Sequence, residues 1–260
     1  MLRPRIIPCL LIKNGGLVKT VQFDNPKYVG DPINAVRIFN EKEVDELIIA
    51  DIDATVHNCE PDYNMIRNIA MECRMPLCYT GGVKTLEQVE QIISLGVEKI
   101  GISSASVDTP ELITESTRRV GSQSVVVVID VRKVGLPYHY EIFTHNGTQK
   151  TGLDPVQFVK SAEALGAGEI LINSIDHDGK MQGYDLDLVD QVRNVVNLPL
   201  SLLGGAGSLG DIEDLIRRYG IIGAAAGSLF VFKGKYHAVL INYPSRNEKE
   251  NLCYRGMYTK

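Results

Sequence analysis

The chain of 260 residues contains no tryptophan, and aromatic residues make up only 7% of it. It has no basic excess either, because 27 Lys and Arg residues face 32 Asp and Glu residues, a formal net charge of −5. Without a basic run, the phosphate attraction that dominates nonspecific nucleic-acid binding is missing, so we expect no nucleic-acid partner. No apolar stretch approaches the roughly 18 residues of a membrane helix, so we expect no membrane insertion. The hydrophobic share of 44% is that of an ordinary globular core.

Cysteine is scarce, and its pattern carries no Cys-x-x-Cys pair. The five residues are Cys9, Cys59, Cys73, Cys78 and Cys253. Their odd number and mostly apolar surroundings favour buried, reduced thiols in a cytoplasmic protein. Arg3 and Arg5 precede an apolar run, as in a secretory signal, but Pro8 interrupts that run and Lys13 ends it. No small-residue cleavage site follows, so we expect a cytoplasmic location.

Short apolar runs alternate with amphipathic segments along most of the chain. The β-branched runs lack period-2 alternation, as expected of parallel strands buried on both faces. They span 6–12, 46–50, 76–80, 99–102, 124–130, 169–172, 198–203 and 221–226. The helical patterns between them span 33–43, 62–73, 84–95, 111–119, 156–165, 186–196 and 208–219. Eight strands with at least seven crossover helices predict an α/β fold, either a (β/α)8 TIM barrel or, as the alternative, a doubly wound sheet.

An internal repeat favours the barrel. Pro76-Leu77 followed by Gly81-Gly82 recurs as Pro199-Leu200 followed by Gly204-Gly205, at an offset of 199 − 76 = 123 residues. Residues 1–120 and 121–232 therefore read as two (β/α)4 half-barrels, which together form a barrel domain over 1–232. Residues 233–260 form a C-terminal tail that we expect to pack on the barrel or extend it.

Small residues follow four of the expected strands, at the end where barrel enzymes bind ligands. The two glycine pairs follow strands 3 and 7, and we expect each to open a helix. The set comprises Gly81, Gly82, Ser103, Ser104, Gly204, Gly205, Gly227 and Ser228. Glycine admits close backbone approach and helix amides favour anions, so the duplicated set predicts two phosphate sites. Tight turns between strand and helix are the alternative explanation.

Acidic residues at the same end are candidates for catalysis. Asp130 closes a strongly apolar run, so its partly desolvated carboxylate is a plausible general acid or base, with loop orientation as the alternative. Its counterpart in the first half is Leu11, which disfavours chemistry by two carboxylates. The Asp176-His177-Asp178-Gly179 segment and Asp51-x-Asp53 near His57 fit no specific metal motif, and we expect no metal. Asp178 and Gly179 remain candidates for holding a ligand hydroxyl or phosphate.

Four alternating charges lie at the opposite, amino-terminal ends of the strands: Arg5, Glu46, Lys99 and Glu169. Barrel bottoms usually serve stability, so a structural ion-pair ring is one expectation. A gate through the barrel is the other, and the spacing alone does not decide between them.

Longer motifs resemble the cyclase subunit family of imidazole glycerol phosphate synthase from residue 1 to about 232. They include Arg5-Ile6-Ile7, Gly30-Asp31-Pro32, Gly121-Ser122-Gln123, 166–171, Ser174-Ile175-Asp176-x-Asp178-Gly179 and Gly204-Gly205-Ala206-Gly207. The resemblance implies a glutaminase subunit bound at the barrel bottom in a heterodimer, and ammonia passing through the barrel. It implies that Arg5, Glu46, Lys99 and Glu169 form the gate, with Glu98 and Gln123 at the partner interface. It adds Lys19 to the residues expected to bind substrate or phosphate, and we expect Asp51 and Asn173 to bind there as well.

The centre of the expected site departs from the family. The family has two catalytic aspartates, whereas this chain has Leu11 and Asp130. Leucine cannot transfer a proton, so we expect the usual cyclase/lyase reaction to be severely impaired. Cys78, Asn173 and Ser103 also replace family residues, while the peripheral phosphate loops persist. This pattern indicates altered substrate or chemistry.

The tail over 238–245 resembles a paralogous branch that is linked to sugar amidation in surface polysaccharide synthesis. The first hypothesis is therefore an ammonia-conducting subunit that works with a glutaminase and a sugar amidotransferase, acts on a phosphorylated small molecule or sugar nucleotide, and needs no cofactor. The second is true histidine-pathway catalysis, with Asp51 or Asp176 replacing the missing aspartate. The third is a non-catalytic scaffold that activates the glutaminase.

Overall fold

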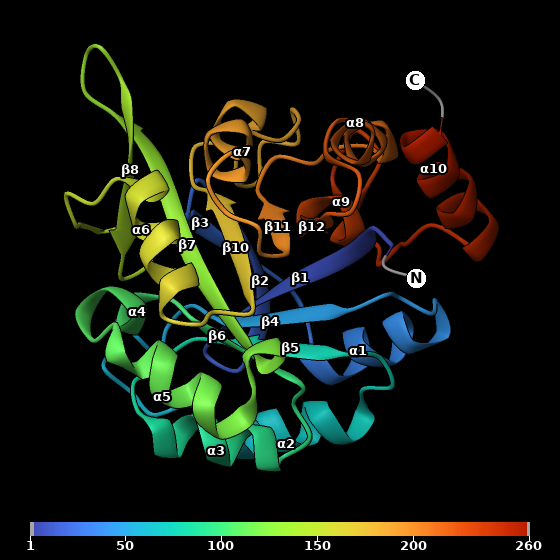
Figure 1. Ribbon diagram of the computed structural model, residues 1–260. Coiled ribbons are helices and arrows are strands. Elements are labelled where there is room, and N and C mark those ends of the chain that lie inside the picture. Colours follow the sequence, from blue (N-terminus) through green and yellow to red (C-terminus); the bar gives the residue numbers. More distant parts are fainter. Residues whose placement is uncertain (1–2, 259–260) are drawn as a thin grey trace.

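Eight parallel strands close into a barrel in the computed structural model, which describes residues 3–258 (Figure 1). Each strand pairs with the next along the chain, and the last pairs with the first through Arg5 and Gly223. The strands are β1 (Arg5–Lys13), β4 (Leu47–Asp51), β5 (Leu77–Thr80), β6 (Lys99–Ile102), β7 (Val125–Val134), β10 (Glu169–Ser174), β11 (Leu200–Leu203) and β12 (Gly223–Ala226). This closure confirms the predicted TIM barrel and excludes the doubly wound sheet.

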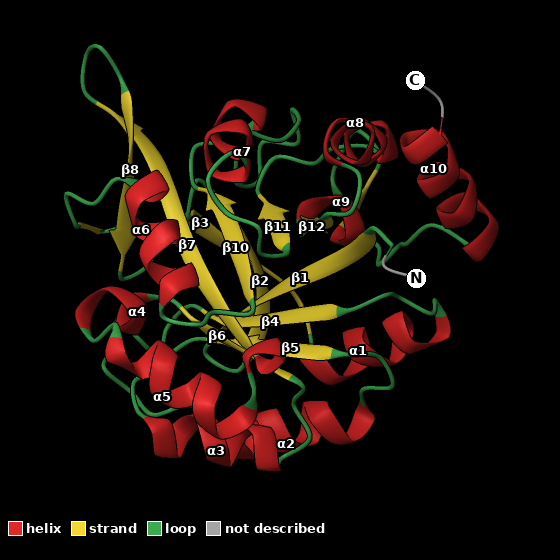
Figure 2. Ribbon diagram, in the orientation of Figure 1, coloured by secondary structure: helices red, strands yellow, loops and turns green. Residues whose placement is uncertain are grey.

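Seven helices of eight or more residues cover the outside of the strands between residues 32 and 219 (Figure 2). They are α1 (Pro32–Glu41), α2 (Tyr63–Glu72), α3 (Leu86–Ser94), α5 (Glu111–Val120), α6 (Pro155–Ala164), α7 (Leu186–Arg193) and α8 (Leu209–Tyr219). Helices α1 and α6 begin with proline at the first helical position, and the Asp31 and Asp154 side chains accept backbone N–H bonds there. Helix α2 begins at Tyr63, one residue after the start of the expected range 62–73, and Asp62 caps it.

Two antiparallel excursions, which the run pattern did not predict, extend the first strand of each half. Strand β1 continues into β2 (Gly16–Val21) and β3 (Asp24–Gly30), and β7 continues into β8 (His139–Thr144) and β9 (Gln149–Lys150). Short helices α4 (Ser104–Asp108) and α9 (Ser228–Val231) follow β6 and β12, and the 3-10 turn η1 (Ser122–Ser124) precedes β7. The excursions and short helices thus occur at matching positions of the two expected halves.

The apolar residues form two separate layers. The larger layer fills the space between strands and helices, with Ile6, Phe39 and Ile100 fully buried. The smaller layer fills the inside of the barrel. It contains Ile7, Cys9, Ile48, Cys78, Val126, Val128, Leu171, Leu203 and Ala225, with Leu11 packed against it. Alternate residues of each strand therefore supply alternate layers.

The tail folds into a short hairpin, β13 (Phe232–Lys233) with β14 (Ala238–Val239), and a helix, α10 (Arg246–Tyr258), that lies beside α8 (Figure 1). Leu252 is 1% exposed at this contact, and Gly256 lies against Ile216. The Tyr243 hydroxyl donates to the Ile6 carbonyl at 2.8 Å and ties the tail to β1. Within residues 3–258 the longest apolar stretch of any helix falls short of a membrane span.

Candidate functional site

Four charged side chains meet at the amino-terminal end of the barrel. Arg5 on β1 donates to Glu169 at 2.6 Å and also bonds Glu46. Lys99 on β6 donates to Glu46 and to Glu169, each at 2.9 Å. The structure thus brings together all four residues of the expected gate, with signs alternating around a ring.

Burial and charge pairing oppose each other in this ring. Burial raises the pKa of Glu169, but Arg5 and Lys99 outweigh it and hold the pKa below its usual range. Burial likewise acts to lower the pKa of Lys99, and the Glu169 and Glu46 carboxylates reverse that effect. Charge pairing therefore favours the charged forms of Lys99 and Glu169 despite their burial.

Ser201 is a fifth member of the ring, and sequence reasoning missed it. Its hydroxyl donates to Glu169 Oε1 at 2.5 Å, and Arg5 donates to its oxygen at 3.3 Å. The polar residue within the apolar run 198–203 is the signal that could have identified it. A Cβ on Gly223 would lie 1.9 Å from the Ser201 hydroxyl, so glycine on β12 leaves room for this bond.

The two residues expected at the partner interface lie at the same end of the barrel. Glu98 directly precedes β6, and its carboxylate accepts from the Leu77 amide at 2.7 Å. Gln123 lies in η1, directly before β7. Both residues are exposed and therefore accessible to a second chain.

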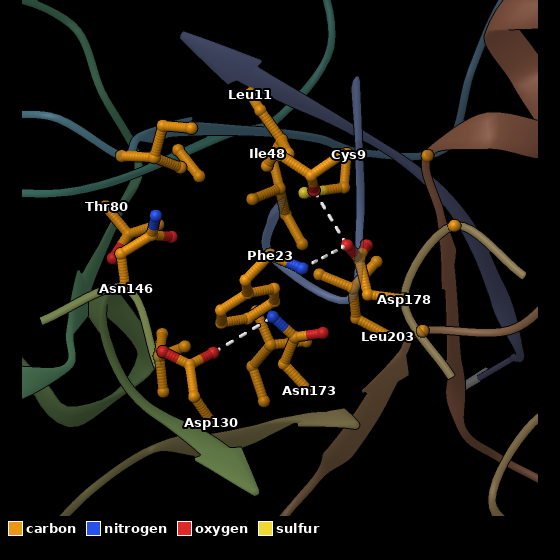
Figure 3. A pocket seen from close by; sticks show the side chains of 18 of the residues that line it. Cys9, Leu11, Phe23, Ile48, Thr80, Asp130, Asn146, Asn173, Asp178 and Leu203 are labelled. Atoms are coloured by element: carbon orange, nitrogen blue, oxygen red, sulfur yellow. Dashed lines mark hydrogen bonds between the residues drawn. The ribbon is translucent and has the colours of Figure 1, made fainter. Parts of the chain in front are cut away.

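The inner apolar layer separates the ring from a pocket at the carboxyl ends of the strands. Cys9 and Cys78 lie in this layer, and burial raises the pKa of Cys9 to about 11. Burial also raises the pKa of Cys78, so both thiols remain neutral and add no charge to the barrel interior. The pocket beyond them has a volume of about 110 Å³ and is lined by side chains from both halves (Figure 3).

Asp130 is the titratable group best placed for proton transfer in this pocket. Burial raises its pKa to about 7, with Asn173 lowering and Asp178 raising it to lesser extents. Asn173 is its partner in register on β10 and donates from Nδ2 to Oδ1 of Asp130 at 2.9 Å. A carboxyl with this pKa exchanges protons readily near neutral pH. Neither Lys13 nor Arg132 pairs with it; Lys13 lies 3.5 Å from Asp53 instead.

Leu11 lies across the pocket from Asp130 (Figure 3). Asp51 also lines the pocket, but its carboxylate accepts from the Asp53 and Ala54 amides at 2.9 and 3.1 Å. Burial raises the pKa of Asp51, and these two bonds partly offset that effect. Asp51 is thus held by backbone amides, whereas Asp130 is held by the Asn173 side chain.

Asp178 and Gly179 hold the β2–β3 hairpin over the barrel. Asp178 Oδ2 accepts from the Thr20 hydroxyl at 2.7 Å and from the Phe23 amide at 3.1 Å. A Cβ on Gly179 would lie 2.2 Å from the Thr20 carbonyl, so only glycine allows this approach. The Phe23 ring consequently projects into the pocket between Asp178 and Asp130 (Figure 3).

Lys19 lies deeper than a surface phosphate ligand. It is 5% exposed, and its ammonium donates to the Cys9 carbonyl at 2.5 Å. Burial lowers its pKa. A Cβ on Gly227 would lie 2.3 Å from the Lys19 nitrogen, so the glycine before Ser228 makes room for the lysine.

The glycine pairs do not open helices, which corrects the sequence expectation. Helices α3 and α8 begin at Leu86 and Leu209, four residues after the respective pairs, behind capping boxes at Thr85 and Ser208. The pairs instead allow close contact between neighbouring loops. A Cβ on Gly81 would lie 2.3 Å from the Asp51 carbonyl oxygen, and one on Gly82 would lie 2.7 Å from the Ala54 Cβ. A Cβ on Gly204 would lie 2.6 Å from the Ser174 carbonyl oxygen, and one on Gly205 would lie 2.0 Å from the Gly183 carbonyl oxygen.

Ser103 and Gly227 do precede short helices, α4 and α9, and line the pocket with Ser104 and Ser228. Asp176, which the sequence analysis considered as a metal ligand, accepts a hydrogen bond from the Lys133 amide at 2.7 Å. Residues 3–258 hold no group of three or more His, Cys, Asp or Glu side chains arranged for a metal.

The comparisons with known proteins agree with this geometry. The histidine biosynthesis protein family matches residues 5–237. The chain belongs to this family. It is 56% identical over 254 residues to a provisionally named imidazole glycerol phosphate synthase subunit HisF from Leptospira interrogans, covering 98% of this chain and 100% of that protein.

Two further relatives show how sequence identity differs between the matched proteins. A provisionally named hisF2 subunit from Pseudomonas aeruginosa is 53% identical over 248 residues, 95% of this chain and 98% of the relative. The imidazole glycerol phosphate synthase subunit HisF of Natranaerobius thermophilus is 38% identical over 250 residues, 96% and 99% of the two chains. Relatives named hisF3 and hisF2 are thus 57% and 53% identical to this chain, in keeping with a paralogous HisF-like branch of the family.

Proposed function

We propose that this chain is the barrel subunit of a glutamine-dependent complex, which receives ammonia from a separate glutaminase at the charged ring and delivers it to the pocket. The observation that carries the proposal is the order of features along one barrel: ring, apolar interior and pocket with Asp130. Glu98 and Gln123, exposed beside the ring, are the proposed contacts with the glutaminase. The names of the relatives, which denote subunits of a synthase, support a partner chain.

The apolar interior suits ammonia better than ammonium. A charged ion in the inner layer loses its hydration without a compensating partner, whereas a small neutral molecule does not. To admit ammonia, an ion pair of the ring must separate. We propose that the Lys99 side chain moves to open the ring. All its bonds in the ring come from one nitrogen atom, whereas Arg5 uses two nitrogens to bond both glutamates and Ser201.

We propose amidation of an N-acetyl group to an acetamidino group on a surface-polysaccharide sugar as the overall reaction, with a sugar amidotransferase as third partner. Leu11 opposite Asp130 supports a departure from two-carboxylate cyclisation. The resemblance of the tail to the polysaccharide-linked branch supports the substrate class. Asp130 then transfers protons at the exit, and the loops at Gly81, Ser103, Gly204 and Gly227 accommodate a phosphorylated or nucleotide-linked acceptor.

Histidine-pathway cyclisation is the second candidate, and the neutral-range pKa of Asp130 favours it as well. Asp51 lines the pocket and is the residue available as a second acid or base. Asp176 is less suited, because its carboxylate already caps the Lys133 amide. A scaffold that only activates the glutaminase would need the ring and interface but not Asp130.

Deletion of the gene separates these functions. The proposal predicts loss of acetamidino sugars from the surface polysaccharide, read by mass spectrometry, with growth on medium lacking histidine unchanged. Complementation with Lys99→Met should restore little product, whereas Lys160→Met, on the exposed face of α6, should restore it fully. Histidine auxotrophy would favour the cyclase instead. Full restoration by Asp130→Asn would favour the scaffold.

A further inference from the structure

The amide oxygen of Asn173 has no hydrogen-bond partner among the described residues, although the side chain is nine-tenths buried. Its Nδ2 is committed to Asp130, and its oxygen points to the other side, towards Leu203 and Asp178 (Figure 3). An unsatisfied buried acceptor costs about 1–3 kcal/mol. Such an atom in a pocket wall marks the place where a ligand donates a hydrogen bond.

The polar groups around this oxygen are acceptors. Asp130 uses Oδ1 for Asn173, and Asp178 uses Oδ2 for both of its bonds, so each carboxylate keeps a second oxygen. The nearest cation, Lys19, donates to the Cys9 carbonyl. Leu11, Ile48 and Leu203 add apolar wall to the pocket, and Thr80 and Asn146 add polar wall (Figure 3).

We infer that the pocket centre is a binding site for a small group rich in N–H donors, an amidinium or ammonium, with Asn173 Oδ1 accepting one N–H and Asp130 and Asp178 flanking the charge. An anion would be repelled by the two carboxylates. A cation there replaces lost hydration with charge-assisted hydrogen bonds. This inference deepens the proposed function by naming the nitrogen group that the pocket holds.

The test uses three probes of nearly the same shape: acetamidinium, acetamide and acetate. The purified full chain alone, labelled with nitrogen-15, is titrated at about pH 8.5, where acetamidinium stays charged and Asp130 is ionised. We expect acetamidinium to shift the Asn173 side-chain resonance and to bind at least ~10-fold more tightly than either other probe. Equal or tighter binding of acetate or acetamide would overturn the inference.

Two substitutions of Asn173 separate its oxygen from its packing. Asn173→Leu keeps the branching at Cγ but removes the acceptor, and it should raise the acetamidinium dissociation constant about 10-fold or more. Asn173→Asp keeps an oxygen at the same position and should bind within about 3-fold of the parent chain. The matched control is Asn194→Leu at the exposed end of α7, which should leave binding unchanged. Unchanged binding in Asn173→Leu contradicts the assignment. If Asn173→Leu does not fold, loss of acetamidinium binding in Asn173→Asp contradicts the assignment instead.

The binding measurement is independent of the glutaminase. Absent acetamidinium binding together with loss of acetamidino sugars on gene deletion would reject this inference and leave the proposed function standing. Binding together with an unaltered polysaccharide would reject the proposed function and leave the site.

Discussion

Asp130→Asn is predicted to stabilise the folded protein at alkaline pH and to have little effect at acidic pH. The parent carboxyl has a folded pKa of about 7 because it is desolvated, against an ordinary value of 3.8. The native state therefore holds its proton to higher pH than the unfolded chain does. By linkage, the parent loses stability as the pH rises from about 4 to about 7. Above about pH 7, the contribution of Asp130 to the unfolding free energy no longer changes with pH.

The magnitude follows from the size of the shift. About three pH units at ~1.4 kcal/mol each give an upper value of ~4 kcal/mol. The Asp130 residue is only half-buried, open on its pocket side, so solvent screening lowers the expected difference to about 2 kcal/mol. Asparagine carries no charge at any of these pH values and can keep a hydrogen bond to Asn173.

Urea unfolding of both chains at pH 4, 5, 6, 7 and 8 tests this prediction. The unfolding free energy of Asp130→Asn minus that of the parent should grow by about 2 kcal/mol from pH 4 to pH 8. Glu115→Gln, on the exposed face of α5, controls for removal of a carboxylate charge from the molecule. A difference that stays constant across the range would refute the desolvation account of Asp130.

Three further substitutions probe the pocket, the ring and the tail. Leu11→Asp, which restores a carboxylate opposite Asp130, should allow growth of a histidine auxotroph that lacks its cyclase, whereas the parent chain should not; growth with the parent chain contradicts this. Ser201→Ala removes the hydroxyl bond to Glu169 and should lower the unfolding free energy in urea by ~1 kcal/mol; an unchanged midpoint counts against its place in the ring. Leu252→Ala, at the contact of α10 with α8, should cost about 2–4 kcal/mol and speed amide exchange in α10; unaltered exchange would show that the tail does not depend on this contact.

The barrel was predictable because each parallel strand is buried on both faces and therefore appears as a continuous apolar run. The β2–β3 and β8–β9 excursions were not, since β3 and β9 are largely exposed, β2 and β8 mix polar with apolar residues, and all four owe their pairing to the strand they extend. Helix α10 was missed for a similar reason: its polar sequence shows no apolar stripe, and a single deeply buried side chain, Leu252, anchors it.

Within the site, charge alternation at the strand starts predicted which residues meet in the ring. Periodicity does not report hydrogen bonding, so the roles of Ser201, Phe23 and the Asn173 oxygen required the folded geometry. The same limit explains the glycine pairs. Composition shows that the chain turns there, but only the packed loops show that Gly205 makes room for the Gly183 carbonyl and does not start a helix.

The central claim, direct passage of ammonia through the barrel, is tested most directly by isotope competition. Permeabilised cells receive glutamine labelled with nitrogen-15 at its amide and an excess of unlabelled ammonium chloride, and mass spectrometry reads the new nitrogen of the acetamidino sugar. If ammonia travels from the ring to the pocket without mixing with solvent, that nitrogen carries mostly nitrogen-15. Dilution to the isotope ratio of the bulk ammonium pool would contradict a conducting barrel.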